Sequence, residues 1–232
     1  MIANALSENK NLRLSNFSAG RDRLENKGIT ALAGVFKAMG GSLEVIEVPQ
    51  NGIKKDGMIA LMEALKANSE SLREVHLHDN WIKGEAIDRL VEFVVRAKKL
   101  ELLNVSDSTM GTEAALLLVT ALSQSESTIR TTLKHFSCNY NEVESPTVSK
   151  RILDILLSDA FTALDIVEYK GNAIGRKAAQ GYLKKFEERG RKLLIFDEDE
   201  DEEDVDEEEE EEEDIEGIDE EDLMKKLEAL KL

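Results

Sequence analysis

A repeat of about 29 residues is the feature that most constrains what this chain can fold into. The segments 43–57 (LEVIEVPQNGIKKDG) and 72–86 (LREVHLHDNWIKGEA) share the frame L-x-x-L-x-L-x-x-N-x-L-x-x-x-G, with Val or Ile for Leu and Ala for Gly. The frame also fits 14–28, 100–114, 133–147 and 164–178, so its first leucines are 29, 29, 28, 33 and 31 residues apart. One such unit cannot bury its apolar face alone, and we expect the copies to stack as a solenoid.

Each repeat predicts a short strand followed by a helix. The strand residues that should point inward alternate with outward ones, and they are Ile46 and Val48, Val75 and Leu77, and Leu103 and Val105. Apolar pairs four residues apart then predict one helical stripe facing the strands: Leu32/Phe36, Leu61/Leu65, Leu90/Val94 and Leu118/Leu122. We therefore predict an α/β leucine-rich-repeat solenoid of the ribonuclease-inhibitor type, with parallel strands on the concave side and helices on the convex side.

The frame asparagine comes directly after each strand. It is Asn51, Asn80, Asn141 and Asn172, with Asp22 and Ser108 as variants. A short amide at this position can bond backbone groups of the turn that would otherwise be buried and unpaired. We interpret these asparagines as a structural ladder rather than as catalytic amides.

Composition changes sharply along the chain. Segment 197–222 holds 22 acidic residues and no basic one, whereas the remainder has 30 basic and 26 acidic residues. We expect a solenoid over 1–196, a disordered acidic tail over 197–222 and a short amphipathic segment over 223–232. Residues 2–8 resemble the helical part of a repeat, so we expect either repeats upstream or a partner over that end. At the other end, 176–189 and 192–196 should form a cap.

The same composition excludes several classes of protein. The folded part has no basic surplus for nucleic acid, one cysteine rules out a disulfide scaffold, and no apolar run is long enough to span a membrane. No signal peptide is recognisable, so we expect a cytoplasmic protein. His76, His78 and His135 are too far apart along the predicted sheet to converge on a metal, and Cys138 should face the core. No metal, cofactor or catalytic motif is predicted.

Partners of a solenoid bind to its concave face and to the loops after its strands. In the segment AGRDRLEN, Arg21 and Arg23 could fork onto carboxylate or phosphate groups, and neither occupies a core position of the frame. Trp81 projects from a loop of an aromatic-poor chain and is a candidate hot-spot residue. At the C-terminus, Leu223, Leu227, Leu230 and Leu232 fit a leucine-rich nuclear export pattern, which a receptor would read in a groove.

Several stretches resemble a known family. AGRDRLENKG (19–28), VPQNGI (48–53) and LHDN (77–80), followed by a polyacidic segment, are similar to the GTPase-activating protein for the small GTPase Ran. The resemblance implies a cytoplasmic regulator, not itself an enzyme, that raises GTP hydrolysis by Ran without an inserted arginine finger. It implies a Ran-binding edge at Arg21, Arg23, Glu25, Asn26, Gln50 and Asn51, to which we add His78, Asp79 and Trp81. The family's functional asparagine and an earlier arginine lie in repeats that would precede residue 1, so neither carries over.

Three functions therefore remain as hypotheses. The first is a Ran GTPase activator in nucleocytoplasmic transport that is cytoplasmic, held at the nuclear envelope or shuttling, with a nuclear export receptor as a second partner. The alternative is an acidic leucine-rich nuclear phosphoprotein or histone-chaperone-like adaptor that binds basic proteins, although repeats of this length disfavour it. A bare protein-binding scaffold of the ribonuclease-inhibitor type would leave the acidic tail without a role.

Overall fold

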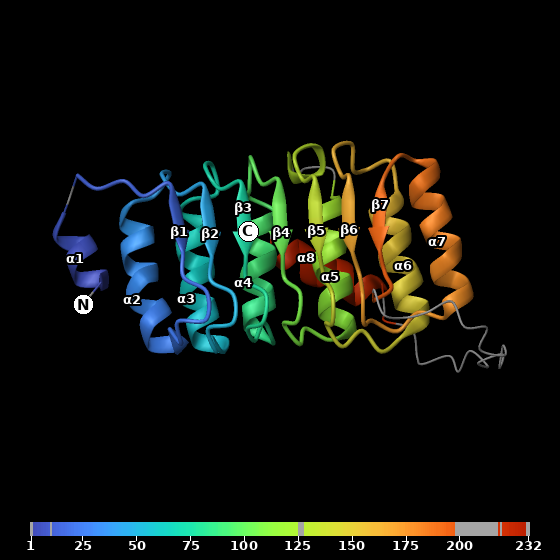
Figure 1. Ribbon diagram of the computed structural model, residues 1–232, viewed down its shortest axis with the longest axis horizontal. Coiled ribbons are helices and arrows are strands. Elements are labelled where there is room, and N and C mark those ends of the chain that lie inside the picture. The colour runs from blue at the N-terminus through green and yellow to red at the C-terminus, as the bar shows by residue number, and fades with distance from the viewer. Residues whose placement is uncertain (1, 10, 125–127, 198–217, 219, 231–232) are drawn as a thin grey trace.

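The computed structural model describes residues 2–9, 11–124, 128–197, 218 and 220–230. Over these residues strands and helices alternate, and the strands form one parallel sheet in the order β1-β2-β3-β4-β5-β6-β7 (Figure 1). The strands are β1 (Asn16–Ser18), β2 (Val45–Glu47), β3 (Glu74–His76), β4 (Leu102–Asn104), β5 (His135–Ser137), β6 (Ile166–Glu168) and β7 (Lys192–Leu194). The helices are α1 (Ile2–Glu8), α2 (Glu25–Ala38), α3 (Lys55–Lys66), α4 (Glu85–Val94), α5 (Thr112–Ser123), α6 (Pro146–Leu157), α7 (Arg176–Glu188) and α8 (Glu220–Leu230), with a 3₁₀ turn, η1 (Thr128–Thr131).

The register of the sheet follows the frame of the sequence. Ile46 in β2 pairs with Phe17 on one side and with Val75 on the other, and Val75 in turn pairs with Leu103. Equivalent residues of successive repeats therefore lie side by side, and their side chains form continuous rows. The inward strand residues predicted from the alternation are all buried, as is Cys138. The α/β fold with parallel strands is confirmed, and its course along the chain is that of a solenoid.

Helices α2 to α7 all cover the same face of the sheet and leave the other face open (Figure 1). The predicted helical pairs are buried, from Leu32/Phe36 to Leu118/Leu122. Between the two layers, the rings of Phe17 and Phe36 meet edge to face, with their centroids 4.9 Å apart. Edge-to-face packing of this kind is a favoured arrangement of aromatic rings.

A second buried asparagine, Asn68, supports the turn at the other edge of the sheet, and the sequence frame did not single it out. Its side-chain oxygen accepts hydrogen bonds from the backbone N–H groups of Gly41 (3.0 Å) and Leu43 (3.3 Å). Its nitrogen donates to the carbonyls of Phe36 (3.0 Å) and Ala64 (2.9 Å). Asn68 therefore ties the ends of two neighbouring helices together.

The two ends of the described solenoid differ. At one end α1 packs on α2, and at the other β7 pairs with β6 beside α7, as the sequence predicted for the cap. The C-terminal helix α8 begins at Glu220, three residues before the predicted start of the amphipathic segment, and it returns to lie against α4 and α5. Most of the predicted acidic tail, 198–217 and 219, lies outside the described residues. None of the described helices has both the length and the apolar character needed to cross a bilayer.

Candidate functional site

The loops that leave the strands share an unusual backbone conformation. Seven residues after the first leucine of its repeat, each of Arg21, Gln50, Asp79, Asp107 and Tyr140 has a positive φ, at 60°, 51°, 57°, 52° and 50°. Residues other than glycine rarely adopt this left-handed conformation, because the Cβ atom crowds the backbone. The five residues form a column along one edge of the solenoid, which we call the loop edge. The frame aligns these residues, but it did not predict their left-handed conformation.

The frame asparagines hold the loop edge in this conformation. The Asn51 side-chain oxygen accepts hydrogen bonds from the backbone N–H groups of Asp22 (3.1 Å) and Leu24 (3.2 Å), both in the preceding repeat. The Asn51 nitrogen donates to the carbonyls of Ala19 (2.6 Å) and Pro49 (2.9 Å). Each asparagine thus joins two repeats, and the predicted structural ladder is present.

The ladder continues along the sheet with one interruption. Asn141 accepts hydrogen bonds from the N–H groups of Ser108 (3.1 Å) and Met110 (3.5 Å), and Asn172 accepts one from the Asn141 N–H (3.1 Å). At the variant position, the Ser108 hydroxyl reaches only the Ser106 carbonyl (3.1 Å) of its own loop. The preceding repeat is bonded there by the Ser108 backbone carbonyl, which accepts from the Ile82 N–H at 3.0 Å. At this position a backbone carbonyl therefore makes the bond between repeats, because the serine side chain is too short to reach the preceding repeat.

Two of the predicted partner-binding residues make hydrogen bonds within the fold. Asn51 is buried and its side chain bonds backbone groups through both of its polar atoms. The Asn26 side-chain oxygen accepts a hydrogen bond from the Lys54 N–H (2.8 Å) at the start of α3. We therefore leave Asn51 and Asn26 out of the candidate partner surface, because a group already bonded within the fold offers little to a partner.

Unlike Asn51 and Asn26, the arginines Arg21 and Arg23 have side chains that point into solvent. Arg21 belongs to the loop edge and Arg23 lies two residues later in the same loop; both are exposed, and both have positive φ angles. The Arg21 backbone N–H donates to the Pro49 carbonyl at 3.0 Å, which anchors the loop to the next repeat. Among the described residues, neither guanidinium group has a hydrogen bond or an ion pair with another side chain. The loop is held by its backbone, and both side chains remain available. Glu25 is also exposed, next to them at the start of α2.

Gln50, Asp79 and Trp81 extend this surface over the next two loops. Gln50 is exposed, Asp79 is half-buried, and the Trp81 side chain is 54% exposed. The Lys54 ammonium lies 4.8 Å from the centre of the Trp81 ring, within the range of a cation–π contact. A half-exposed indole with a positive charge beside it can pack against an apolar or acidic partner group.

His78 follows β3 and directly precedes Asp79 of the loop edge. Burial, together with the neighbouring His76, lowers its pKa below the ordinary value for histidine. We therefore place the imidazole of His78 in the neutral form at pH 7. It can take part in a partner surface as a hydrogen-bonding group but not as a positive charge.

A separate polar cluster lies on the open face of the sheet, between β5 and β6. His135 Nε2 is 2.6 Å from Glu168 Oε1 and 3.1 Å from Ser137 Oγ, and the Asn139 amide donates to Glu168 Oε2 at 3.0 Å. Burial raises the pKa of Glu168, but the hydrogen bonds from Asn139, His135 and Ser137 outweigh it and lower the pKa. Because serine and glutamate meet the same ring nitrogen, this cluster lacks the arrangement of a catalytic triad, which uses both nitrogens.

The histidines and the cysteine form no metal centre. Over the part of the chain that the structure describes, no three His, Cys, Asp or Glu side chains come together as a metal-binding group. Burial raises the pKa of the Cys138 thiol to about 12, which leaves it protonated at neutral pH. A buried protonated thiol is neither a nucleophile nor a metal ligand.

Tyr140 belongs to the same loop edge farther along the solenoid, and it was not among the residues predicted from the sequence. Its side chain is 43% exposed, and its ring lies against Gly171, where any Cβ atom would collide with it. Its hydroxyl donates to Asp197, the first residue of the predicted acidic tail, and Lys170 Nζ lies 3.8 Å from the same carboxylate oxygen. The frame places Tyr140 in line with Arg21 and Gln50, and this alignment was the signal available in the sequence.

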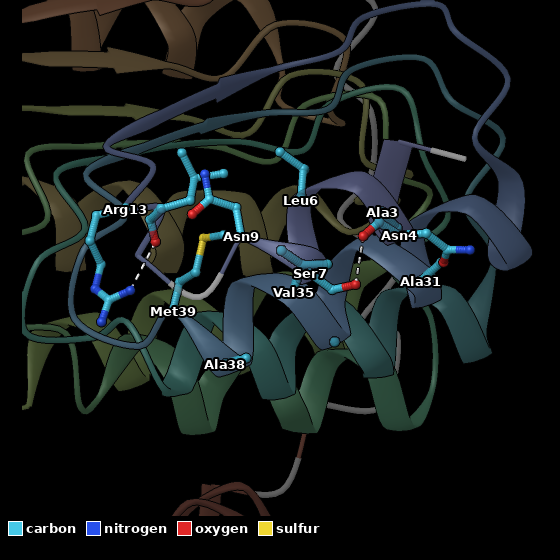
Figure 2. A pocket seen from close by; sticks show the side chains of 12 residues that line it. Ala3, Asn4, Leu6, Ser7, Asn9, Arg13, Ala31, Val35, Ala38 and Met39 are labelled. Atoms are coloured by element: carbon cyan, nitrogen blue, oxygen red, sulfur yellow. Dashed lines mark hydrogen bonds between the residues drawn. The ribbon is translucent and has the colours of Figure 1, made fainter.

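A cleft of about 440 Å³ lies at the N-terminal end, between α1 and α2 (Figure 2). Leu6 and Val35 contribute apolar surface, whereas Asn9 and Arg13 contribute polar groups. The Arg13 guanidinium donates to the neighbouring Leu12 carbonyl at 2.9 Å. The cleft has no cluster of chemically active side chains, and it lies apart from the loop edge.

The described leucines of the predicted export pattern are buried or partly buried. Leu223 and Leu227 are buried in α8, Leu230 is partly buried, and Leu232 lies outside the described residues. The predicted apolar face of this segment exists, but it is turned toward the solenoid.

No protein-family model matches the chain. A stretch of 44 residues is 54% identical to Ran GTPase-activating protein 1 of Xenopus laevis. The match covers 19% of this chain and 7% of that protein. The likeness is therefore local, and this chain is similar over that short stretch to a Ran GTPase-activating protein.

Proposed function

We propose that the chain is a helix-bearing leucine-rich-repeat solenoid that binds a Ran-like small GTPase and raises its rate of GTP hydrolysis. The surface that would bind the GTPase consists of Arg21, Arg23, Glu25, Gln50, His78, Asp79 and Trp81. The observation that carries the proposal is the pair of arginines, exposed on a backbone that the next repeat holds in place. The local match to a Ran GTPase-activating protein agrees with it.

The physical case rests on preorganisation. The ladder bonds of Asn51 and the bond from the Arg21 N–H to Pro49 hold the arginine loop before any partner arrives. A partner then has little backbone entropy to remove when it binds, and less binding free energy is lost to ordering. Guanidinium groups form paired hydrogen bonds with carboxylates, so we assign Arg21 and Arg23 to acidic groups of the GTPase.

In this proposal the chain is a regulator and contributes no reacting group of its own. GTP hydrolysis would use the catalytic residues and magnesium of the GTPase, and the solenoid would orient them by binding alongside. A cytoplasmic location fits such a role, because the activator would then act on the GTPase outside the nucleus.

The binding surface is tested by replacing both arginines. We expect Arg21→Ala/Arg23→Ala to weaken binding to Ran loaded with a non-hydrolysable GTP analogue at least tenfold, which corresponds to about 1.4 kcal/mol. Titration calorimetry measures the affinity, and a thermal melt checks that the fold is intact. Lys177→Ala/Lys184→Ala removes the same charge from the exposed side of α7 and should leave the affinity unchanged. Equal affinity for the arginine variant and the parent would remove the arginines from the surface.

Activation is tested separately from binding. Parent protein at micromolar concentration is added to Ran·GTP, and the release of phosphate is followed in a single turnover. We expect acceleration with the parent and with the lysine control, and a smaller effect with the arginine variant at subsaturating concentration. Binding without acceleration would refute the activator role and leave a Ran-binding protein.

The acidic segment keeps the second candidate function open. Its 22 acidic residues within 197–222 would attract basic proteins at low salt, as a histone-chaperone-like adaptor does. This function would use the tail rather than the loop edge. The arginine variant would therefore bind a basic partner as well as the parent does.

A further inference from the structure

The middle of helix α5 is apolar around its whole circumference, unlike the other helices that cover the same face of the sheet. Five consecutive residues, Ala115 to Val119, are buried. At 3.6 residues per turn, five consecutive side chains point in every direction around a helix, so they cannot all face the strands. Leu117 is 2% exposed, whereas Ala31, at the same frame position in α2, is exposed. Something must cover the outer side of α5.

The covering element is α8. In Figure 1 this helix, drawn in red, lies behind α5 on the helical side of the molecule, and it contacts both α4 and α5. Leu227 is 1% exposed, and Leu223 is buried beside it one helical turn earlier. On the opposite side of α8, Met224 is 41% exposed and Lys225 pairs with Glu221 at 2.9 Å. The apolar stripe of α8 therefore meets the apolar outer side of α5.

One ion pair links α8 to α4 on this surface. Lys226 Nζ lies 2.8 Å from Asp88 Oδ1 on α4, and that oxygen is buried. In the described part of the chain, Lys226 is the cation paired with Asp88. A buried carboxylate oxygen is costly to leave unpaired, so the ion pair favours a helix that carries lysine next to its leucine stripe.

We propose that the outer side of α4 and α5 is a binding seat for a leucine-faced helix, and that α8 fills this seat in cis. We call this surface the convex seat. The side chains that α8 buries there, Leu223, Leu227 and Leu230, are those that a receptor groove would take from an export-type leucine pattern. One apolar face cannot occupy two grooves at once. The docked helix therefore withholds the leucines, and a partner gains access to them only when α8 leaves the seat.

Two aspartate substitutions on α8 test the seat in the full chain. Leu227→Asp places a charge in the seat and should release α8, whereas Met224→Asp places the same charge on the exposed side and should not. The probe is a fluorescent peptide of residues 218–232 added at about 10 µM. In the parent and in Met224→Asp the tethered helix competes at an effective concentration on the order of 1 mM. For a peptide that binds the open seat with a Kd of about 10 µM, we expect these two proteins to show an apparent affinity about a hundredfold weaker than Leu227→Asp does, because competition weakens binding by the ratio of the effective concentration to Kd.

Hydrogen exchange gives a second readout that needs no peptide. Backbone amides of 220–230 should be protected in the parent and in Met224→Asp, and they should exchange at least tenfold faster in Leu227→Asp. If Leu227→Asp unfolds the whole protein, as judged by circular dichroism, variants of the ion pair between Lys226 and Asp88 provide the test instead. Asp88→Lys and Lys226→Asp should each speed the exchange, and the double variant should restore protection.

Several outcomes would overturn the proposal. They are equal peptide binding by all three proteins, equal exchange of the α8 amides in all of them, or a double charge variant as unprotected as the single ones. Protection that rises with protein concentration between 5 and 100 µM would place α8 in the seat of a second copy and overturn docking in cis. None of these measurements involves Ran, so their failure would not affect the proposed GTPase binding.

Discussion

At the residue scale, the frame asparagine joins neighbouring repeats through several hydrogen bonds. Asn80 accepts hydrogen bonds from the N–H groups of Asn51 (3.2 Å) and Ile53 (3.0 Å), and it donates to the Val48 carbonyl (2.8 Å). These partners belong to the preceding repeat, so the residue joins neighbours as well as closing its own turn. It also helps to keep loop-edge residues in a conformation that they would not adopt alone.

Asn80→Ala should lower the free energy of unfolding by about 3 kcal/mol or more, because several buried backbone groups lose their partner at once. Urea unfolding followed by circular dichroism measures the effect. Asn104→Ala is the control, since Asn104 accepts one hydrogen bond, from Ser106 (3.0 Å) in its own loop, and its loss should cost about 1 kcal/mol or less. Similar midpoints for the two variants would contradict the role of the ladder.

At the element scale, the spacing between helices depends on small residues at specific positions. A Cβ atom on Gly57 of α3 would lie 2.7 Å from Asn26 Oδ1 and 2.8 Å from Ile29 Cγ2, both on α2. A Cβ atom on Gly181 of α7 would meet nothing within 4 Å. Gly57 therefore sets how closely two helices approach, whereas Gly181 only weakens its own helix.

Replacing each of these glycines with alanine should change the free energy of unfolding in opposite directions. Gly57→Ala should destabilise the protein by about 1–3 kcal/mol, because α2 and α3 must move apart to admit the methyl group. Gly181→Ala should stabilise it by about 0.5–1 kcal/mol, because alanine favours the helix. Thermal and urea melts of the two variants, run beside the parent, measure both effects. A stabilising Gly57→Ala would mean that the two helices are less closely packed than described.

At the scale of the whole molecule, most of the net negative charge lies in one segment of the chain, and most of the apolar core lies in the repeats. The net charge is −18, yet 22 acidic residues lie within 197–222. The described solenoid is held by a continuous apolar core that runs from α2 to β7 and includes residues of α8. The charged segment thus connects the last repeat to a helix that returns to the convex side.

Replacing 198–217 with Gly and Ser residues of equal number tests this separation while keeping the tether to α8. We expect the melting temperature to stay within a few degrees, because a polyacidic sequence buries too little apolar surface to add stability. Binding to poly-lysine at low salt should be lost, since the attraction is electrostatic. A large fall in the melting temperature would assign the segment a packing role and contradict the prediction.

The repeat by itself determined much of this structure. Period-two alternation identified inward residues such as Val75 and Leu77, and the spacing of four identified helical pairs such as Leu61/Leu65. These inferences succeeded because in a solenoid each repeat contacts mainly its neighbours, so local pattern and final packing coincide. The same frame located the asparagine ladder and placed Arg21 and Arg23 at the loop edge.

Contacts between residues far apart in the sequence were decided by the tertiary structure alone. Asn26 looked available until Lys54, 28 positions later, occupied its oxygen. The leucines of α8 looked like a free motif until α4 and α5, about a hundred residues earlier, covered them. An apolar stripe shows that a face must be buried, but it does not show which surface will bury it. That choice depends on the three-dimensional fit, which no period in the sequence encodes.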